Sequence, residues 1–365
     1  LHAIIQVNTF KLLYAVDDKI VQAREHLNEL FGRKYPMAFT PDALDYYEDS
    51  ADELAIINYT SGTTSNSKGV MIPYRALWSN IDFGIDAYGK YVQPGDRVLS
   101  MLPMAHMYGM AFEFIFEFIS GMHVNFLTKM ASPTILLKAL AEVKPVIIVM
   151  VPLIIEKIVR KSIMPKIQDP KVKMLMKMPV IGQSIKKKIC DGLTQALGGN
   201  FYEVIIGGAA LNQDVENLLR EIKFPFTIGY GATECAPIIT YSDFKESRAT
   251  SCGKAVRNME LKIDSPDPQN VPGEILTRGL NVMLGYYKNE EATSTTLDSE
   301  GWYHTGDLGV MDSEGYVFIK GRSKNMLLGA NGQNIYPEEI EDKLSNMTLV
   351  AECVVIQNKE THKRS

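Results

Sequence analysis

The feature that most constrains the fold of this sequence is an alternation of short β-branched apolar runs with helical stretches. The apolar runs predict strands at 54–59, 146–151, 203–206 and 226–228, and the intervening stretches predict helices at 133–143, 153–161 and 213–220. Ser132 and Asn212 stand where helix N-caps are expected. Such alternation predicts an α/β fold, with mostly parallel sheets covered by helices. Ligands in such folds bind at the carboxyl ends of strands.

The pattern changes toward the carboxyl end of the chain. From about Gly273, short alternating runs separated by Gly, Asn and Asp predict antiparallel strands. Pro337 opens a predicted acidic helix, PEEIEDKLS, at 337–345, and a final strand is predicted at 350–356. We therefore expect a first domain over 1–321, which includes a small antiparallel β subdomain at about 240–321. We expect a hinge and the start of a small α+β domain over 322–365.

Composition excludes some classes of protein. Hydrophobic residues make up 46% and charged residues 22% of the chain, as in soluble globular proteins. The net charge of −5 argues against nucleic-acid binding, which needs a basic surface. No apolar run reaches the roughly 18 residues needed to cross a bilayer. The four cysteines lack metal-ligand spacing and are predicted to be free thiols in a reducing compartment, so a cytoplasmic location is expected.

The segment YTSGTTSNSKGV, from Tyr59 to Val70, carries the strongest chemical signal. A predicted strand enters a loop of small hydroxyl residues that can offer N–H groups, hydroxyls and the Lys68 ammonium to phosphate oxygens. The segment is not a Walker A loop, because Gly69 rather than Ser or Thr follows the lysine. A flexible surface loop is the alternative interpretation of this segment alone.

Further motifs follow in order along the chain: GGAAL at 207–211, GYGATE at 229–234, GWYHTGD at 301–307 and GRSKNMLLGANGQNIYPEEIE at 321–341. Together with the loop after Tyr59, they resemble the signatures of the adenylate-forming superfamily, which includes acyl-CoA synthetases, peptide-synthetase adenylation domains and beetle luciferases. The texture is most similar to that of long-chain fatty-acyl-CoA synthetases. Ser65 and Ser67 stand where this superfamily usually has Gly and Pro.

The resemblance implies a nucleotide site with Tyr230 stacked on adenine and Asp307 at the ribose. It assigns ATP or AMP binding to Thr60, Ser61, Gly62, Thr63, Thr64, Lys68, Gly207, Gly208, Ala209, Tyr230, Gly231, Thr233, Asp307 and Arg322. It also implies Mg²⁺ on Glu234 and Thr60, and a hinge at Lys324. Because a carboxylate must attack a phosphate anion, Lys68, Mg²⁺ and oriented hydroxyls would neutralise charge.

His106, in LPMAHMYG, is implied by the same resemblance to lie beside the substrate carboxylate, with a packed histidine as the alternative. After it, Phe112, Ile115, Phe116 and Ile119 recur at helical spacing. Core packing is the favoured interpretation of this apolar face. The alternative is an acyl pocket lined by His106, Phe112, Phe116 and Gly208. The stretch 102–110 contains no acid to pair with a substrate ammonium, which favours a plain carboxylic acid.

The segment from Arg160 to Lys188 has nine lysine or arginine residues against the single acid Asp169, with methionines interleaved. A solvated helical excursion is the favoured interpretation. The alternative is a patch that contacts anionic membrane lipids, which would place the protein peripherally at a membrane.

The predicted function is ATP-dependent activation of a fatty acid to acyl-AMP, followed by transfer to coenzyme A, with catalytic roles for Lys68, His106 and Glu234. The alternatives are a CoA ligase for a medium-chain or aryl acid, and a non-catalytic acyl-adenylate or lipid-binding module. The chain opens with LHAIIQVNTF, a strand already in progress, and lacks the superfamily's C-terminal Ser-Gly-Lys context. We therefore expect truncation at both ends, so that the activity belongs to the longer parent protein.

Overall fold

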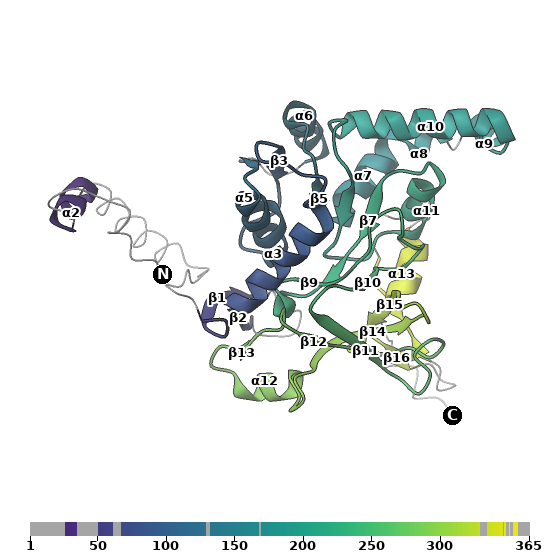
Figure 1. The fold of residues 1–365 in the computed structure, drawn as a ribbon. Helices are drawn as coiled ribbons and strands as arrows, with labels where there is room; N and C mark the ends of the chain where they lie inside the picture. Colours follow the sequence, from purple (N-terminus) through teal and green to yellow (C-terminus); the bar gives the residue numbers. More distant parts are fainter. Residues whose placement is uncertain are drawn as a thin grey trace, which may run out of the picture.

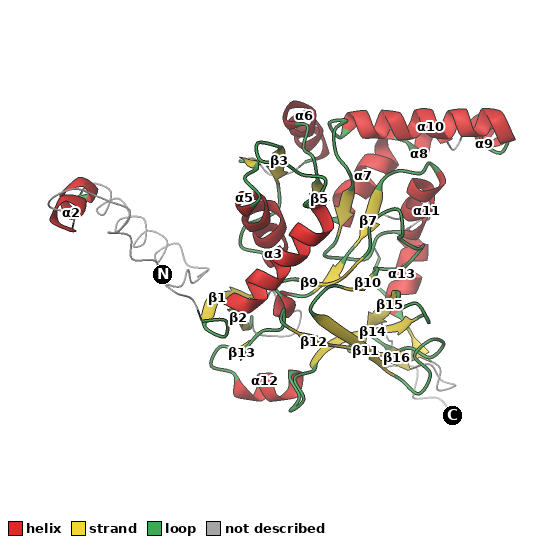
Figure 2. Ribbon diagram, in the orientation of Figure 1, coloured by secondary structure: helices red, strands yellow, loops and turns green. Residues whose placement is uncertain are grey.

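The computed structural model describes residues 26–34, 50–60, 67–128, 132–167, 169–328, 334–345, 347, 350 and 353–356. Figures 1 and 2 show helices gathered around short strands on one side of the molecule and a twisted antiparallel sheet on the other. The helices are α2 (Leu27–Lys34), α3 (Tyr74–Tyr88), α4 (Met107–Met110), α5 (Phe116–Ile119), α6 (Pro133–Val143), α7 (Pro152–Ser162), α8 (Met164–Ile167), α9 (Pro170–Met176), α10 (Pro179–Ala196), α11 (Gln213–Glu221), α12 (Glu290–Thr296) and α13 (Pro337–Ser345).

The predicted α/β architecture is confirmed. Parallel strands are β3 (Arg97–Ser100) with β4 (His123–Phe126), and β5 (Ile148–Met150), β6 (Val204–Ile206) and β7 (Phe226–Ile228) in that order. Ser132 caps α6, since its hydroxyl accepts the N–H of Ile135 at 3.4 Å, and Asn212 caps α11 in the same way through Val215. Both caps agree with the sequence prediction.

A buried apolar core holds the parallel sheet in place. All residues of β5 and β6 are buried, so these strands are covered on both faces. Leu136 and Leu140 of α6 and Ile155 of α7 are completely buried in the same cluster. The loops that follow the carboxyl ends of these strands are therefore supported by a well-packed sheet.

Two further sheets are antiparallel, which the mostly parallel expectation did not anticipate. The first consists of β1 (Leu54–Tyr59), β2 (Gly69–Pro73) and β13 (Gly285–Tyr286). The second consists of β8 (Tyr230–Gly231), β9 (Ile238–Tyr241) and β10 (Lys254–Ala255). Tyr59 pairs with Gly69, so the proposed phosphate loop connects the two strands of a hairpin. Such a short connection cannot return a strand in parallel, because a parallel crossover needs about a dozen or more residues.

The predicted antiparallel subdomain is present as a four-stranded sheet. Its strands are β11 (Met259–Asp264), β12 (Gly273–Gly279), β14 (Tyr303–Met311) and β15 (Val317–Arg322), followed by the short pair β16 (Leu327–Leu328) and β17 (Asn334–Ile335). The final strand predicted at 350–356 is wrong for the described residues of that range, which have no strand. The strand expected at the start of the chain lies outside the described residues. The boundary between 321 and 322 stays a prediction.

The aromatic segment after His106 departs from a simple α-helix. Residues Ala111–Ile115 form a π-helical turn with Phe112 at φ −118° and ψ 15°. A π turn shifts the faces of a helix, so the predicted apolar face does not stay together. Phe112 and Phe116 are buried, whereas Ile119 is 51% exposed, and Glu113 and Glu117 of the same segment are also buried. Phe112 contacts Phe83 edge to face at 5.9 Å, which confirms core packing for this ring.

No helix of the described part of the chain is long and apolar enough to span a bilayer. All four cysteines are free thiols, as predicted.

Candidate active site

A first cluster joins the hairpin of the phosphate loop to the GYGATE motif. The Lys68 ammonium lies 4.5 Å from the centre of the Tyr286 ring, and the Tyr286 hydroxyl donates to Glu234 Oε1 at 2.7 Å. Strand β13 carries Tyr286 beside β2, and the backbone N–H of Met283 donates to the carbonyl of Glu234. Burial, with Glu234 beside it, raises the pKa of Tyr286, so this hydroxyl stays a donor. The sequence predicted Lys68 and Glu234 together, and Tyr286 is the residue that links them.

A second cluster joins motifs that lie far apart in the sequence. The Tyr230 hydroxyl donates to Asp307 Oδ2 at 2.7 Å, and Arg322 Nε lies 2.9 Å from Asp307 Oδ1. Asp307 and Arg322 are cross-strand partners on β14 and β15. Burial raises the pKa of Asp307, and the Arg322 charge and the Tyr230 hydrogen bond oppose that rise. The predicted adenine and ribose residues therefore share one hydrogen-bonded group.

The loop at Gly207–Ala209 follows the central strand β6. The carboxyl end of a central parallel strand is where such folds bind ligands. Gly208 has φ +90°, a conformation that favours glycine, and a Cβ there would meet only Val151 at 3.8 Å. The Tyr108 ring lies against Gly207, and its hydroxyl donates to the Ile205 carbonyl at 3.2 Å. Tyr108 thus brings the His106 region to this loop.

His106 is exposed at the N-cap position of α4, so it is not a packed core histidine. Its loop is fixed from both sides. Asn58 Nδ2 donates to the Ala105 carbonyl at 2.7 Å, while Glu113 Oε2 accepts the N–H groups of Met101 at 2.9 Å and Leu102 at 2.7 Å. The backbone that presents His106 is therefore anchored by two buried polar side chains.

Thr60, Gly231 and Thr233 adjoin these clusters along the chain. The Thr60 N–H donates to the Lys68 carbonyl at 3.0 Å, which closes the base of the phosphate loop. Thr233 begins a short 3-10 turn (Thr233–Cys235) that carries Glu234, and a Cβ on Gly231 would lie 2.2 Å from the Pro237 carbonyl oxygen, so that position admits no side chain. Ser61, Gly62, Thr63 and Thr64 lie outside the described residues. The acyl-pocket role of Phe112 and Phe116 stays a prediction, with both rings buried in the core.

Lys324 is exposed in a turn directly after Arg322. Asn325 Nδ2 then donates to Glu338 Oε1 at 2.8 Å, and Asn212 Nδ2 donates to Asp342 Oδ1 at 2.6 Å. These contacts place α13 against β15 and the start of α11. The hinge role of Lys324 stays a prediction.

The donor set is compatible with a hard cation that shares phosphate ligands. Among the described residues no group of three or more His, Cys, Asp or Glu side chains could hold a metal ion by itself. Glu234 offers carboxylate oxygens at the edge of the loop, and Mg²⁺ is commonly bound by one or two carboxylates together with substrate phosphates. Glu234 is therefore the described carboxylate best placed for that role.

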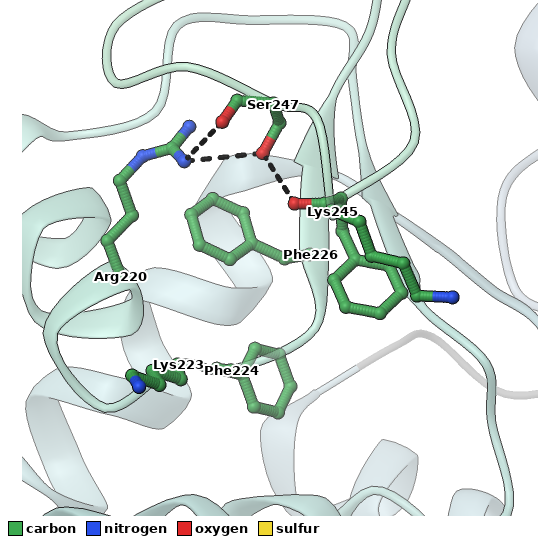
Figure 3. A pocket seen from close by; sticks show the side chains of 7 residues that line it. Arg220, Lys223, Phe224, Phe226, Lys245 and Ser247 are labelled. Atoms are coloured by element: carbon green, nitrogen blue, oxygen red, sulfur yellow. Dashed lines mark hydrogen bonds between the residues drawn. The ribbon is translucent and has the colours of Figure 1, made fainter.

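A cavity of about 300 Å³ lies apart from the predicted residues (Figure 3). Phe224, Phe226 and Phe244 line it, with Arg220, Lys223, Lys245 and Ser247 at its margin. The Arg220 guanidinium is bound by Glu216, by Ser247 and by the Arg248 carbonyl, so it supports the fold. None of the predicted site residues is among its lining.

The sequence analysis missed the residues that join the motifs: Asn58, Tyr108, Glu113 and Tyr286. Asn58 and Glu113 carried a signal, since each is a polar residue inside an apolar run. Tyr108 and Tyr286 carried none, because an aromatic residue in a strand or helix is ordinary core material.

Comparison with known proteins agrees with this geometry. The family model described as AMP-binding enzyme matches residues 8–287. 4-Coumarate–CoA ligase 5 of Oryza sativa subsp. japonica is 29% identical, over 86% of this chain and 55% of the relative. Long-chain-fatty-acid–CoA ligase FadD15 of Mycobacterium bovis is 29% identical, over 84% of this chain and 52% of the relative.

O-succinylbenzoate coenzyme A synthetase (MenE) of Bacillus subtilis, solved with ATP and a magnesium ion, is 25% identical with a TM-score of 0.67, over 84% of this chain and 58% of that one. The chain spans about half the length of the curated relatives named above. The match of the family model covers most of the sequence and includes Lys68, Glu234 and Tyr286 of the first cluster, while Asp307 and Arg322 lie beyond it. The chain belongs to the AMP-binding enzyme family.

Proposed function

We propose that the protein is an AMP-forming CoA ligase that activates a carboxylic acid with ATP and transfers the acyl group to coenzyme A. The observation that carries this proposal is the group formed by Tyr230, Asp307 and Arg322. These residues come from three separate motifs, and the structure joins them by a hydrogen bond of 2.7 Å and an ion pair of 2.9 Å. If the contacts served only the fold, there would be no reason for all three residues to come from motifs that resemble nucleotide-binding signatures.

In the first step a carboxylate oxygen attacks the α-phosphorus of ATP, the bond from that phosphorus to the bridging oxygen breaks, and pyrophosphate leaves. Lys68 would bind phosphate oxygens, and Tyr286 contacts both its ammonium and Glu234. Glu234, with Thr60, would hold Mg²⁺, which supplies positive charge to the leaving pyrophosphate. His106, exposed on its anchored loop, would lie beside the acid carboxylate.

In the second step the sulfur of CoA attacks the acyl carbonyl carbon, the bond to the AMP oxygen breaks, and AMP leaves. We assign Lys324 as the hinge that exchanges the two steps, because it is exposed and lies two residues after Arg322, which we assign to the ribose site.

We further propose that the acid is a long-chain fatty acid and that the enzyme works in the cytoplasm, at a membrane surface. The absence of an acid between Leu102 and Met110 supports a plain carboxylate. Gly208, which meets only Val151 at the Cβ position, leaves room at the carboxyl end of β6. A 4-coumarate–CoA ligase and a fatty-acid–CoA ligase are equally similar to this chain, so an aryl acid is the second candidate.

ATP–pyrophosphate exchange in the whole protein tests the proposal. Octanoate, laurate, palmitate and 4-coumarate are compared at equal concentration, and thioester formation is followed after CoA is added. We expect exchange that is highest with palmitate. If exchange is highest with 4-coumarate, the fatty-acid proposal is wrong and the substrate is an aryl acid. ATP binding without exchange for any acid would identify a non-catalytic adenylate-binding module.

A further inference from the structure

Helices α8, α9 and α10 form an arm that follows α7. Figure 1 shows α10 along the upper edge of the molecule and α9 at its outer end. Helix α9 packs against α8 and α10. The contact between α9 and α10 is close, because a Cβ on Gly182 would lie 2.3 Å from the Met176 carbonyl oxygen. The turn between the two helices is thus the end of a compact hairpin. We call residues 171–181 the arm tip.

The arm tip exposes large apolar side chains. Val180 is 83% and Met174 is 71% exposed, and Leu175, Met178 and Ile181 each expose more than a third of their surface. Met176 alone among the tip methionines is buried, where it contributes to the hairpin contact. Grouped exposed apolar side chains mark interaction sites on soluble proteins. The tip therefore has one buried methionine at the hairpin contact and several exposed apolar side chains around it.

The charge of the arm tip is entirely positive. Lys171, Lys173 and Lys177 are exposed, and no Asp or Glu occurs between Pro170 and Cys190. Within the part of the chain that the structure describes, none of these three lysines forms an ion pair. Asp169, just before the tip, accepts the Lys171 backbone N–H at 2.8 Å and caps α9. Lys186 differs, since its ammonium lies 3.0 Å from Glu221 and ties α10 to α11.

We propose that the arm tip docks on anionic lipid surfaces. Met174, Met178, Val180 and Ile181 enter the boundary between headgroups and acyl chains, while the tip lysines bind headgroup phosphates. A lipid interface offers apolar and anionic contacts together at one surface, which suits lysines interleaved with methionines. Lys171, Lys173 and Lys177 lie at the tip beside the exposed apolar side chains, whereas Lys186 lies behind the tip and is paired with Glu221. The proposed contact therefore uses the tip and not the whole segment Arg160–Lys188. This surface does not depend on the proposed CoA ligase activity.

Vesicle sedimentation without ATP, CoA or fatty acid tests the proposal on the whole protein. The vesicles contain either phosphatidylcholine alone or an equal mixture with phosphatidylglycerol. We expect binding to the anionic vesicles at low salt and weaker binding at high salt, because the Debye length falls to about 3 Å at 1 M. Lys171→Glu with Lys173→Glu and Lys177→Glu should weaken that binding by about a hundredfold or more. Val180→Ser with Ile181→Ser should weaken it by about tenfold or more.

The matched control reverses three exposed lysines elsewhere: Lys90→Glu, Lys138→Glu and Lys343→Glu. It carries the same change in net charge and should bind within about threefold of the unchanged protein. Circular dichroism and pyrophosphate exchange verify that each variant is folded. Absence of binding to anionic vesicles at low salt overturns the proposal, as does equal loss in the tip and control variants. Binding that the serine variant leaves unchanged overturns the insertion of the apolar side chains. An acidic protein partner would be indicated if the tip lysines matter only in the presence of cell extract.

Discussion

The carboxylates of the candidate site and the two carboxylates within the aromatic segment are held in different ways. Asp307 receives a tyrosine hydroxyl and a guanidinium, and Glu234 receives a tyrosine hydroxyl. Glu113 and Glu117 are both buried, and in the described structure Glu113 Oε1 and Glu117 Oε2 have no hydrogen-bond partner. The site carboxylates thus have partners that favour the charged form, and the core carboxylates lack a cation.

Burial raises the pKa of Glu113 to about 8 and that of Glu117 to about 8. At neutral pH these two side chains favour the protonated form. Burial raises the pKa of Asp307 too, but there the Arg322 charge and the Tyr230 hydrogen bond oppose the rise. We therefore expect the negative charge of Asp307 and Glu234 to be needed for function. For Glu113 and Glu117 we expect the shape and hydrogen bonding of the side chain to be enough for stability. An amide should therefore fail at the site and succeed in the core.

The largest effect is expected from Glu234→Gln. The amide keeps the shape and can still accept the Tyr286 hydroxyl, but it removes the negative charge that would hold Mg²⁺. Adenylation should slow by about a hundredfold or more, as when one electrostatic stabiliser is lost. Single-turnover formation of acyl-AMP in the whole protein measures this. Glu246→Gln, at an exposed position, is the matched control. A near-normal rate would remove Glu234 from the metal site.

Asp307→Ala should lower the affinity for ATP by about ten- to a hundredfold, since it removes a ribose acceptor and releases Arg322 and Tyr230. Isothermal titration calorimetry measures the affinity, and thermal unfolding shows whether the variant is folded. Asp307→Asn separates charge from shape and should lose most of the affinity, in contrast to an amide in the core. Affinity equal to that of the unchanged protein would exclude Asp307 from the ribose site.

Glu117→Gln should stabilise the protein, and the gain should grow with pH. The pKa rises from 4.5 to about 8 on folding, so the folded state holds a proton that the unfolded chain releases. The contribution of the Glu117 carboxyl to the free energy of unfolding is therefore fully present below pH 4.5 and is lost as pH rises toward 8. The amide has no such loss and should gain about 1–2 kcal/mol at pH 8 and little at pH 5.

Urea denaturation at pH 5 and pH 8 measures this gain. Glu142→Gln, at an exposed position on α6, should show no such pH dependence. Equal effects of Glu117→Gln at both pH values would contradict the protonated state of the buried carboxyl.

The smallest effect concerns a paired charge at the surface. Lys186→Ala should reduce the free energy of unfolding by about 0.5–1 kcal/mol, because exposed ion pairs contribute little. Lys187→Ala, at the neighbouring exposed position, should change it by less than about 0.5 kcal/mol. The same denaturation experiment at neutral pH compares the two. A larger effect at Lys187 would show that the Glu221 contact is not what distinguishes these lysines.

Local chemistry explains which parts of the fold could be predicted. The strand at Leu54–Tyr59, the helix at Pro133–Val143 and the helix at Pro337–Ser345 have the predicted bounds. Each is set by neighbouring residues: a β-branched run, a serine cap followed by proline, or a proline with acids in the first turn. The aromatic segment at 111–119 could not be predicted, because its π turn depends on what surrounds the rings.

The sequence by itself determined the order of the motifs, the caps Ser132 and Asn212, and the antiparallel sheet that carries Asp307 and Arg322. Local propensity and short motifs suffice for these. Only the tertiary structure decided that Tyr286 joins Lys68 to Glu234, that Glu113 anchors the loop of His106, and that Lys186 is paired while the tip lysines are exposed. These outcomes depend on burial and on contacts between segments distant in the chain, and neighbouring residues do not encode either.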